Sequence, residues 1–289
     1  MQHILLLVIL AQAPADPPPH DRNPVLKAAI ERGLEVGSLA VTLPEPTFRD
    51  GMTAEEQKAA LAGVAGSTRG ADEMLQPSLS APHKLRLQDR KADGAMVRSG
   101  DLVFALRGVD LDAIRPAEAI RRFRSEPVEA GNMRFQVHIL TPEEAAKIPA
   151  PPSSDHEWLS HAVGRLLDRI AVESTDRIVV SKSDDSLILA SRTDPAFGPE
   201  GPFPNRWMTI DLKAGGDVLG PPKSFSGGVG YMKLTRLKGQ DKAMLVEAHF
   251  AYAEPTAWFD GAPILRSKLG LIAQDQVRRI RRELGKGPK

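Results

Sequence analysis

Two side chains able to transfer protons lie two residues apart in segment 243–253, where apolar and polar residues alternate. A period of two is typical of a strand with one buried face. The pattern places Glu247 and His249 together, opposite the apolar side chains. A carboxylate beside an imidazole could act as a general acid and base. The apolar set of this strand is Met244, Val246, Ala248, Phe250 and Tyr252.

A second alternating segment, 206–213, has Met208, Ile210 and Leu212 as its expected inner set. The same alternation predicts that Trp207 points outward, where an aromatic side chain could contact a ligand.

The loop after segment 243–253 places two large aromatic residues beside two carboxylates. Loops held by a sheet often carry function. On a structural interpretation, Trp258 and Phe259 plug the end of the sheet while Glu254 caps backbone amides or pairs with Arg266. The alternative is contact with a ligand or substrate. The candidate binding residues are therefore Trp207, Glu247, His249, Glu254, Trp258, Asp260 and Arg266, and no catalytic residue is assigned.

Other motifs do not predict a cofactor or a metal site. His156 and His161 are five residues apart, so their side chains would diverge by about 140° on one helix. The glycines of segment 226–230 precede an expected strand, whereas a phosphate cradle needs a helix N-terminus. The chain contains no cysteine, which excludes disulfides and thiolate ligands. A Ser/His/Asp triad stays open, because its members can be far apart in sequence.

Composition narrows the class of protein. The 289 residues include 38 basic and 37 acidic side chains, and 42% are hydrophobic. These values are typical of a globular protein and argue against a nucleic-acid binder that acts through bulk positive charge. The length suits one large domain or two of ordinary size.

The N-terminus has the pattern of a secretory signal peptide. Ile4 to Leu10 is an unbroken apolar run, and small residues follow as far as Ala15. The run is too short to span a bilayer, and no later apolar stretch is long enough. We expect cleavage after Ala15 and export to the periplasm or the cell exterior.

Strand and turn patterns predict an α+β fold with a mostly antiparallel sheet and flanking helices. A Pro-rich leader covers residues 16–24, and Asn23 and Thr53 should cap helices over 24–32 and 54–62. The Pro-rich segment 148–154 is the expected linker between two α+β subdomains, 25–147 and 155–289. A helix is expected over 155–172 and another over 271–284.

Residues 228–284, and more faintly 43–114, resemble a group of exported bacterial proteins without an assigned activity. The shared residues include Glu254-Pro255, Trp258-Phe259 and Leu265-Arg266-Ser267. The resemblance implies no catalytic residue and no cofactor. We therefore favour a non-catalytic binding or structural protein of the bacterial envelope. The alternative is a metal-independent hydrolase with acid and base residues near the last strand and loop 254–266.

Overall fold

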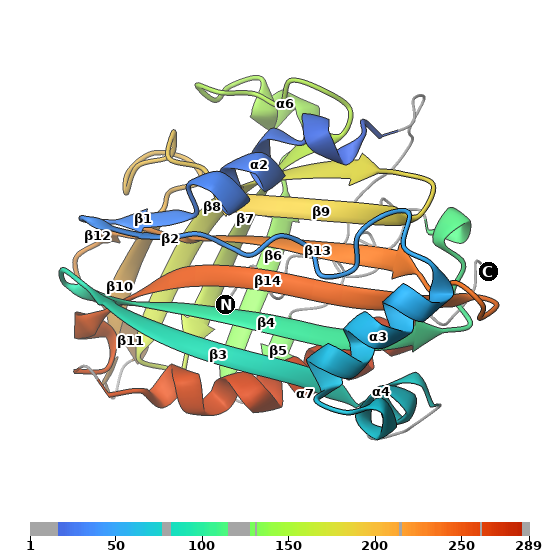
Figure 1. The fold of residues 1–289 in the computed structure, drawn as a ribbon. Coiled ribbons are helices and arrows are strands. Elements are labelled where there is room, and N and C mark those ends of the chain that lie inside the picture. The colour runs from blue at the N-terminus through green and yellow to red at the C-terminus, as the bar shows by residue number, and fades with distance from the viewer. Residues whose placement is uncertain are drawn as a thin grey trace.

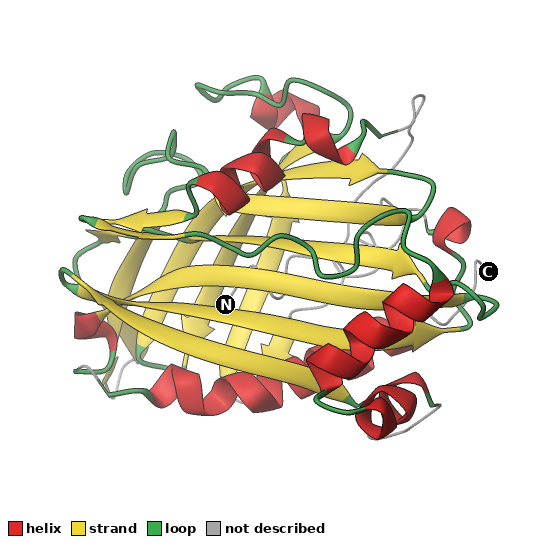
Figure 2. Ribbon diagram, viewed as in Figure 1, coloured by secondary structure: helices red, strands yellow, loops and turns green. Residues whose placement is uncertain are grey.

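The computed structural model describes residues 17–76, 82–114, 128–130, 132–213, 216–260 and 262–284. Within these ranges, a twelve-stranded sheet forms the centre of the molecule, and every strand pairing is antiparallel. The helices lie around this sheet (Figure 2). The predicted α+β class is therefore confirmed. The predicted signal peptide, residues 1–15, lies outside the described residues.

The main path through the sheet runs in the order β3 (His83–Ala92), β4 (Ala95–Arg107), β14 (Ala243–Pro255), β13 (Gly228–Arg236), β9 (Ser186–Thr193), β8 (Ile170–Lys182), β7 (Glu157–Leu166), β6 (Met133–Ile139) and β5 (Val128–Ala130). Off this path, β10 (Arg206–Lys213) pairs with β8, β11 (Gly216–Leu219) and β12 (Lys223–Ser224). A separate ribbon joins β1 (Leu34–Val36) to β2 (Leu39–Val41).

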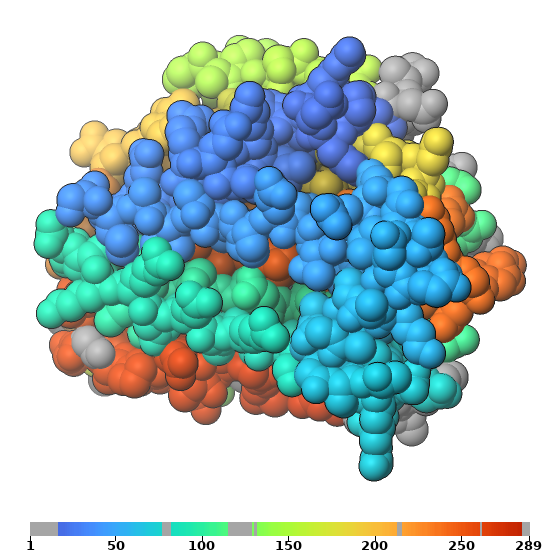
Figure 3. All heavy atoms as spheres, viewed as in Figure 1, coloured from blue at the N-terminus to red at the C-terminus, as the bar shows by residue number. Residues whose placement is uncertain are grey.

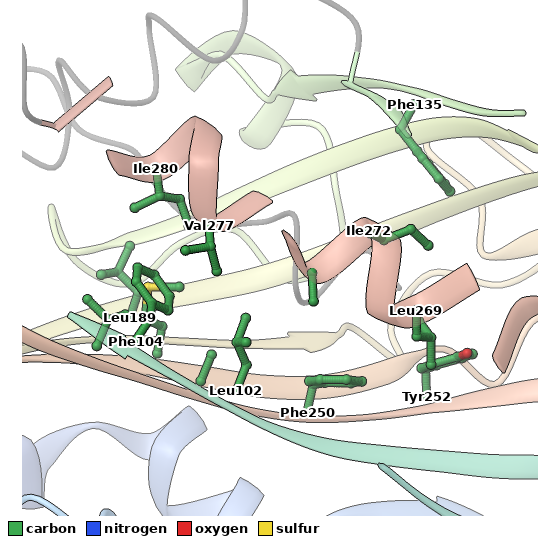
Figure 4. Close-up of a cluster of buried hydrophobic side chains, with 14 of the residues drawn as sticks. Leu102, Phe104, Phe135, Leu189, Phe250, Tyr252, Leu269, Ile272, Val277 and Ile280 are labelled. Carbon is green, nitrogen blue, oxygen red and sulfur yellow. The ribbon is translucent and has the colours of Figure 1, made fainter. Parts of the chain in front are cut away.

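The strands from β3 to β9 form the front of the view in Figure 1, and β8 to β5 lie behind them. We call the side of the sheet that carries the largest hydrophobic cluster its inner face. That cluster also includes the buried side of α7 (Ile264–Leu284), namely Leu265, Leu269, Ile272, Ala273, Val277 and Ile280. Figure 4 shows Leu269 and Val277 pointing toward the front strands, with Phe135 pointing in from β6.

The opposite side, the outer face, is covered by the N-terminal part of the chain. The covering elements are α2 (Pro24–Glu31), the ribbon β1–β2, α3 (Ala54–Ala65) and α4 (Thr68–Leu75). Figure 3 shows these segments, in blue, spread over much of the front strands. Because both faces are covered, most central strands carry apolar residues on both sides.

The caps predicted for the first helices are present. The Asn23 side chain accepts a hydrogen bond from Leu26 N, and Pro24 occupies the first turn of α2. Thr53 and Glu56 form the reciprocal capping box of α3. These hydrogen bonds satisfy backbone N–H groups that the helices themselves leave unpaired. A second capping box opens α6 (Pro142–Ala145).

The helix predicted over 155–172 is wrong. Residues 157–166 form β7 and residues 170–182 form β8, joined by a tight turn in which Leu167 and Asp168 have φ of 53° and 52°. The apolar residues that would form one side of the expected helix are split between the two faces of the sheet. Ala162, Leu166 and Ile170 face inward by register, whereas Leu159 packs in a separate outer cluster. A strand that is buried on both sides can imitate helical spacing.

On the main path, the strands of the C-terminal half form one block, from β14 to β7, and strands of the N-terminal half flank it on both sides. β4 pairs with β14, and β6 pairs with β7. In the expected linker, Ile148 is buried and Ala150 O accepts a hydrogen bond from Arg177. Independent folding of the two halves stays a prediction. No helix among the described residues is long and apolar enough to cross a membrane.

Candidate functional site

A row of polar side chains crosses the inner face, which is otherwise mostly apolar. In the strand register, Ser160 of β7 lies opposite Asp176 of β8, and Asp176 lies opposite Thr193 of β9. Thr193 Oγ1 accepts a hydrogen bond from Gly228 N of β13. Gly228 lies opposite Tyr252 of β14. The row then continues over Arg98 of β4 to Asp89 of β3.

We call these six side chains the polar row: Ser160, Asp176, Thr193, Tyr252, Arg98 and Asp89. Registered residues of neighbouring strands lie about 5 Å apart. The row has one interruption, at β13, where Gly228 stands between Thr193 and Tyr252.

Asp176 is the most deeply buried carboxyl group of the row. Its side chain is 0% exposed. Oδ1 accepts hydrogen bonds from Ser174 Oγ at 3.1 Å and from Thr193 Oγ1 at 2.8 Å. Oδ2 has no partner among the described residues. Burial raises the pKa of Asp176 to about 6 against the effect of the two hydroxyl donors. The carboxyl group therefore has one oxygen fixed and one free to accept a hydrogen bond.

Three further buried polar atoms on this side of the sheet have no partner within the described part of the chain. They are Ser160 Oγ, Tyr252 Oη and Trp258 Nε1. Tyr252 and Trp258 both belong to the inner hydrophobic cluster, and Figure 4 shows the Tyr252 oxygen beside Leu269 of α7. Burial raises the pKa of the Tyr252 phenol, so it stays a donor. A buried polar group without a partner costs about 1–3 kcal/mol. The four atoms belong to the same side of the sheet, and Ser160 and Asp176 are direct neighbours in the β7–β8 register. Buried groups of this kind are satisfied by a bound molecule or by ordered water.

Helix α7 makes its closest strand contacts away from Ser160 and Asp176. Its closest backbone approaches to strands are to β3, β4 and β5, which stand at the two ends of the main strand order. In Figure 1 it runs along the lower margin of the sheet. The polar row, by contrast, has its unpartnered Ser160 and Asp176 on the central strands β7 and β8. These residues thus lie away from the closest helix contacts.

The row ends in a balanced charge cluster. Arg98 Nη2 donates to Glu254 Oε1 at 3.0 Å, and Arg98 Nη1 donates to Asp89 Oδ2 at 2.8 Å. Arg266, in the first turn of α7, reaches the same Asp89 oxygen at 2.9 Å. Arg98 and Glu254 are buried, and Glu254 holds the pKa of Arg98 above its ordinary value despite burial. Two cations and two anions therefore neutralise one another and attach α7 to β3.

Trp258 plugs the sheet beside this cluster, as the structural interpretation of the loop expects. It lies in η3 (Thr256–Trp258), its side chain is 4% exposed, and it stacks on Phe225 with ring centroids 5.6 Å apart. Its ring also meets those of Trp207 and Phe259 edge to face at 6.2 and 6.4 Å. Trp258 Nε1 has no partner among the described residues, so this N–H can also donate a hydrogen bond to a bound molecule.

The predicted outward orientation of Trp207 is wrong. Trp207 is 4% exposed and belongs to the inner cluster, whereas Leu212 of the expected inner set is 68% exposed. The reason is that only the first half of β10 pairs with β8. The second half pairs with β11, whose residues are exposed. Asp260 also lies at the surface, 3.7 Å from Arg169.

Glu247 and His249 lie on the outer face, as their alternation predicts, and hold the N-terminal segment. The two Glu247 oxygens accept hydrogen bonds from Thr47 N at 2.8 Å and Phe48 N at 3.1 Å. His249 Nδ1 lies 2.7 Å from Asp101 Oδ1. Against burial, Asp101 and Glu247 raise the pKa of His249 to about 9. The sheet therefore separates this pair from Glu254, Trp258 and Arg266.

The structure thus divides the seven sequence candidates. Glu254 and Arg266 share the charge cluster on the inner face, and Trp207 and Trp258 are in ring contact in the inner cluster. Glu247 and His249 are on the outer face, and Asp260 is at the surface. Sequence reasoning missed Ser160 and Asp176. The available signal was the period of two over Val172, Ser174, Asp176, Ile178 and Val180, which places hydroxyl and carboxyl groups in a buried position.

Apart from the polar row, the described residues form a surface pocket but do not meet the requirements of a metal site. No group of three or more His, Asp or Glu among them could hold a metal ion. A surface pocket of about 350 Å³ lies at the β13–β14 turn. Arg236 lies in the wall of this pocket and already forms ion pairs with Asp110 and Asp112.

Comparison with known proteins gave no family model and no curated protein that matches the chain. Several solved structures are similar. A STAR-related lipid transfer protein fragment from Xanthomonas axonopodis has a TM-score of 0.38 and 12% identity, over 68% of this chain and 98% of that chain. The lipid transfer and protein localization domain of human StarD13 has a TM-score of 0.40 and 10% identity, over 75% and 93%. Human STARD10 has a TM-score of 0.35 and 9% identity, over 72% and 77%. The similarity is weak at these scores, so the function has to be argued from the contacts of this chain.

Proposed function

We propose that this chain is an exported, non-catalytic binding protein of the bacterial envelope. It holds a mostly apolar molecule against the inner face of the sheet, with the polar group of that molecule at the polar row. The observation that carries the proposal is the set of four buried polar atoms that have no partner within the described part of the chain: Asp176 Oδ2, Ser160 Oγ, Tyr252 Oη and Trp258 Nε1. Binding sites for small molecules typically combine an apolar lining with a few polar groups of this kind.

The arrangement of charges favours binding over hydrolysis. The acid–base pair Glu247 and His249 is committed to Thr47, Phe48 and Asp101 on the outer face. On the inner face, Glu254 is held by Arg98. A general base must reach the proton that it removes, and these side chains are already occupied.

Export is supported by the sequence pattern of Ile4 to Ala15. Pro18 O accepts a hydrogen bond from Lys182 N, and His20 Nδ1 lies 2.9 Å from Ser181 Oγ. Cleavage after Ala15 would therefore leave a mature chain anchored to β8 almost from its first residue. Protein recovered from an envelope fraction should begin at Asp16. An intact Met1 terminus in the cytoplasm would contradict export.

Uptake of a fluorescent apolar probe tests the binding proposal. The chain is stripped with organic solvent, refolded and titrated with a fluorescent long-chain alcohol. We expect saturable 1:1 binding. Ala162→Leu adds bulk to the inner face of β7 beside Ser160 and should weaken uptake at least tenfold. Ala40→Leu, at an exposed position of β2, is the matched control and should bind as the wild type does. Circular dichroism verifies that both variants fold. Absence of saturable uptake by the folded wild type would overturn the proposal.

A further inference from the structure

The surroundings of Asp176 specify the chemistry of the molecule that would bind there. The side chains next to its carboxyl group carry hydroxyls: Ser174, Thr193 and, across the strand pair, Ser160. No cation pairs with Asp176 among the described residues. The nearest arginine in sequence, Arg177, points to the outer face, where it pairs with Glu157 and Asp194.

Two hydroxyl groups donate to Oδ1 and so favour the ionised form of the carboxyl group. They also fix its orientation, which leaves Oδ2 as an acceptor with a defined direction. Burial of a carboxylate without a counter-ion lowers the stability of the folded state by several kcal/mol. A fold that needed only packing here would be more stable with an uncharged side chain. None of the described residues supplies a positively charged hydrogen-bond donor to Oδ2.

We infer that the polar group of the bound molecule is a protonated amine, which donates a hydrogen bond to Asp176 Oδ2 and forms an ion pair with it. This inference rests on the proposed function and names its ligand class: an apolar molecule with a cationic amine end.

Other features of the row fit this assignment. Ser160 Oγ, directly across from Asp176, can accept a second N–H of the amine. Ala162 follows Ser160 on the same face of β7, so the nearest inward side chain along this strand is a small apolar one. With a pKa of about 6, Asp176 is mostly ionised at pH 7.5, where an alkylamine is protonated. The Arg98 and Arg266 cations cannot serve Asp176 because Glu254 and Asp89 neutralise them.

Three probes with the same chain and different ends test the inference: dodecylamine, dodecanol and dodecanoate. Each is titrated below its micelle concentration into the stripped, refolded full chain at pH 7.5, and binding is measured by calorimetry. We expect dodecylamine to bind at least tenfold more tightly than dodecanol, and dodecanoate to bind most weakly.

The isosteric variant Asp176→Asn should lose most of the preference for the amine while it keeps its affinity for dodecanol. Asp72→Asn, at an exposed position of α4, is the charge-matched control and should keep the full preference.

The possible outcomes distinguish failure of the amine assignment from failure of the proposed binding function. Equal affinity for the three probes would overturn the amine assignment and leave apolar binding intact. A preference for dodecanol would do the same and would point to a hydroxyl group as donor. Binding of none of the probes would also remove the proposed function. If Asp176→Asn fails to fold, the order of affinities in the wild type still decides.

Discussion

Replacement of Trp258 by alanine is the sharpest test of the packing that closes the inner face. Trp258 is 4% exposed and contacts three aromatic rings, Trp207, Phe225 and Phe259. A buried tryptophan removes about 150–250 Å² from water. At about 25 cal/mol per Å², this burial stabilises the fold by roughly 4–6 kcal/mol, which is an upper value because the unfolded chain is already partly compact.

One feature of Trp258 lowers the expected cost of its removal. Its Nε1 has no partner among the described residues, so deletion of the indole also removes an unsatisfied donor that costs about 1–3 kcal/mol. We therefore expect Trp258→Ala to lower the free energy of unfolding by about 3 kcal/mol, at the low end for large-to-small core changes. Trp258→Phe keeps a ring against Phe225 and removes the donor, and should cost less than about 1.5 kcal/mol.

Urea unfolding followed by far-ultraviolet circular dichroism measures both variants, because tryptophan fluorescence would itself change. With a slope near 3 kcal/mol per M, the midpoint of Trp258→Ala should fall by about 1 M. A midpoint within 0.2 M of the wild type, about the precision of such a comparison, would refute the reasoning. It would show that Trp258 is not packed, and that loop 254–266 is a surface feature.

Three further changes test other parts of the fold. The raised pKa of His249 means that its protonated form stabilises the fold by roughly 3 kcal/mol. This stabilisation is present below pH 6.5 and is lost as pH rises through about 9. Urea midpoints across this range should show the loss, and His249→Asn should remove this dependence on pH. Glu247→Gln should cost about 1–3 kcal/mol because it leaves the N–H groups of Thr47 and the buried Phe48 with one acceptor oxygen; a midpoint equal to the wild type would show that the N-terminal segment is not held there. Gly164→Ala should cost about 1–3 kcal/mol because its Cβ would overlap the Phe135 ring, whereas Gly198→Ala meets open space and should be neutral in thermal unfolding.

Sequence patterns were informative where one face of an element decides its structure. The alternation over 243–253 placed Glu247 and His249 opposite the apolar set, and β14 follows it. The caps at Asn23 and Thr53 are formed by hydrogen bonds within three residues, so they depend on local chemistry alone.

Sequence patterns failed where the pairing of strands that are distant in sequence determines the position of a residue. The register that joins Ser160, Asp176, Thr193 and Tyr252 links β7, β8, β9 and β14, and no local pattern contains it. Strand β7 is covered on both sides, which gave it the spacing of an amphipathic helix. Trp207 was misplaced because its register opposite Val172 of β8 turns it inward, and Leu212 was misplaced because the second half of β10 pairs with β11. The site therefore depends on sheet topology, whereas its individual strands depend on composition.

The central claim is that a small molecule occupies the inner face at the polar row. Native mass spectrometry of the mature chain, isolated from its own envelope fraction without denaturation, tests it most directly. The account predicts a 1:1 adduct that organic solvent extracts, that carries an amine, and that is reduced at least tenfold in Ala162→Leu. A mass equal to that of the polypeptide alone, in a folded chain that also fails to take up dodecylamine or dodecanol, would contradict the claim.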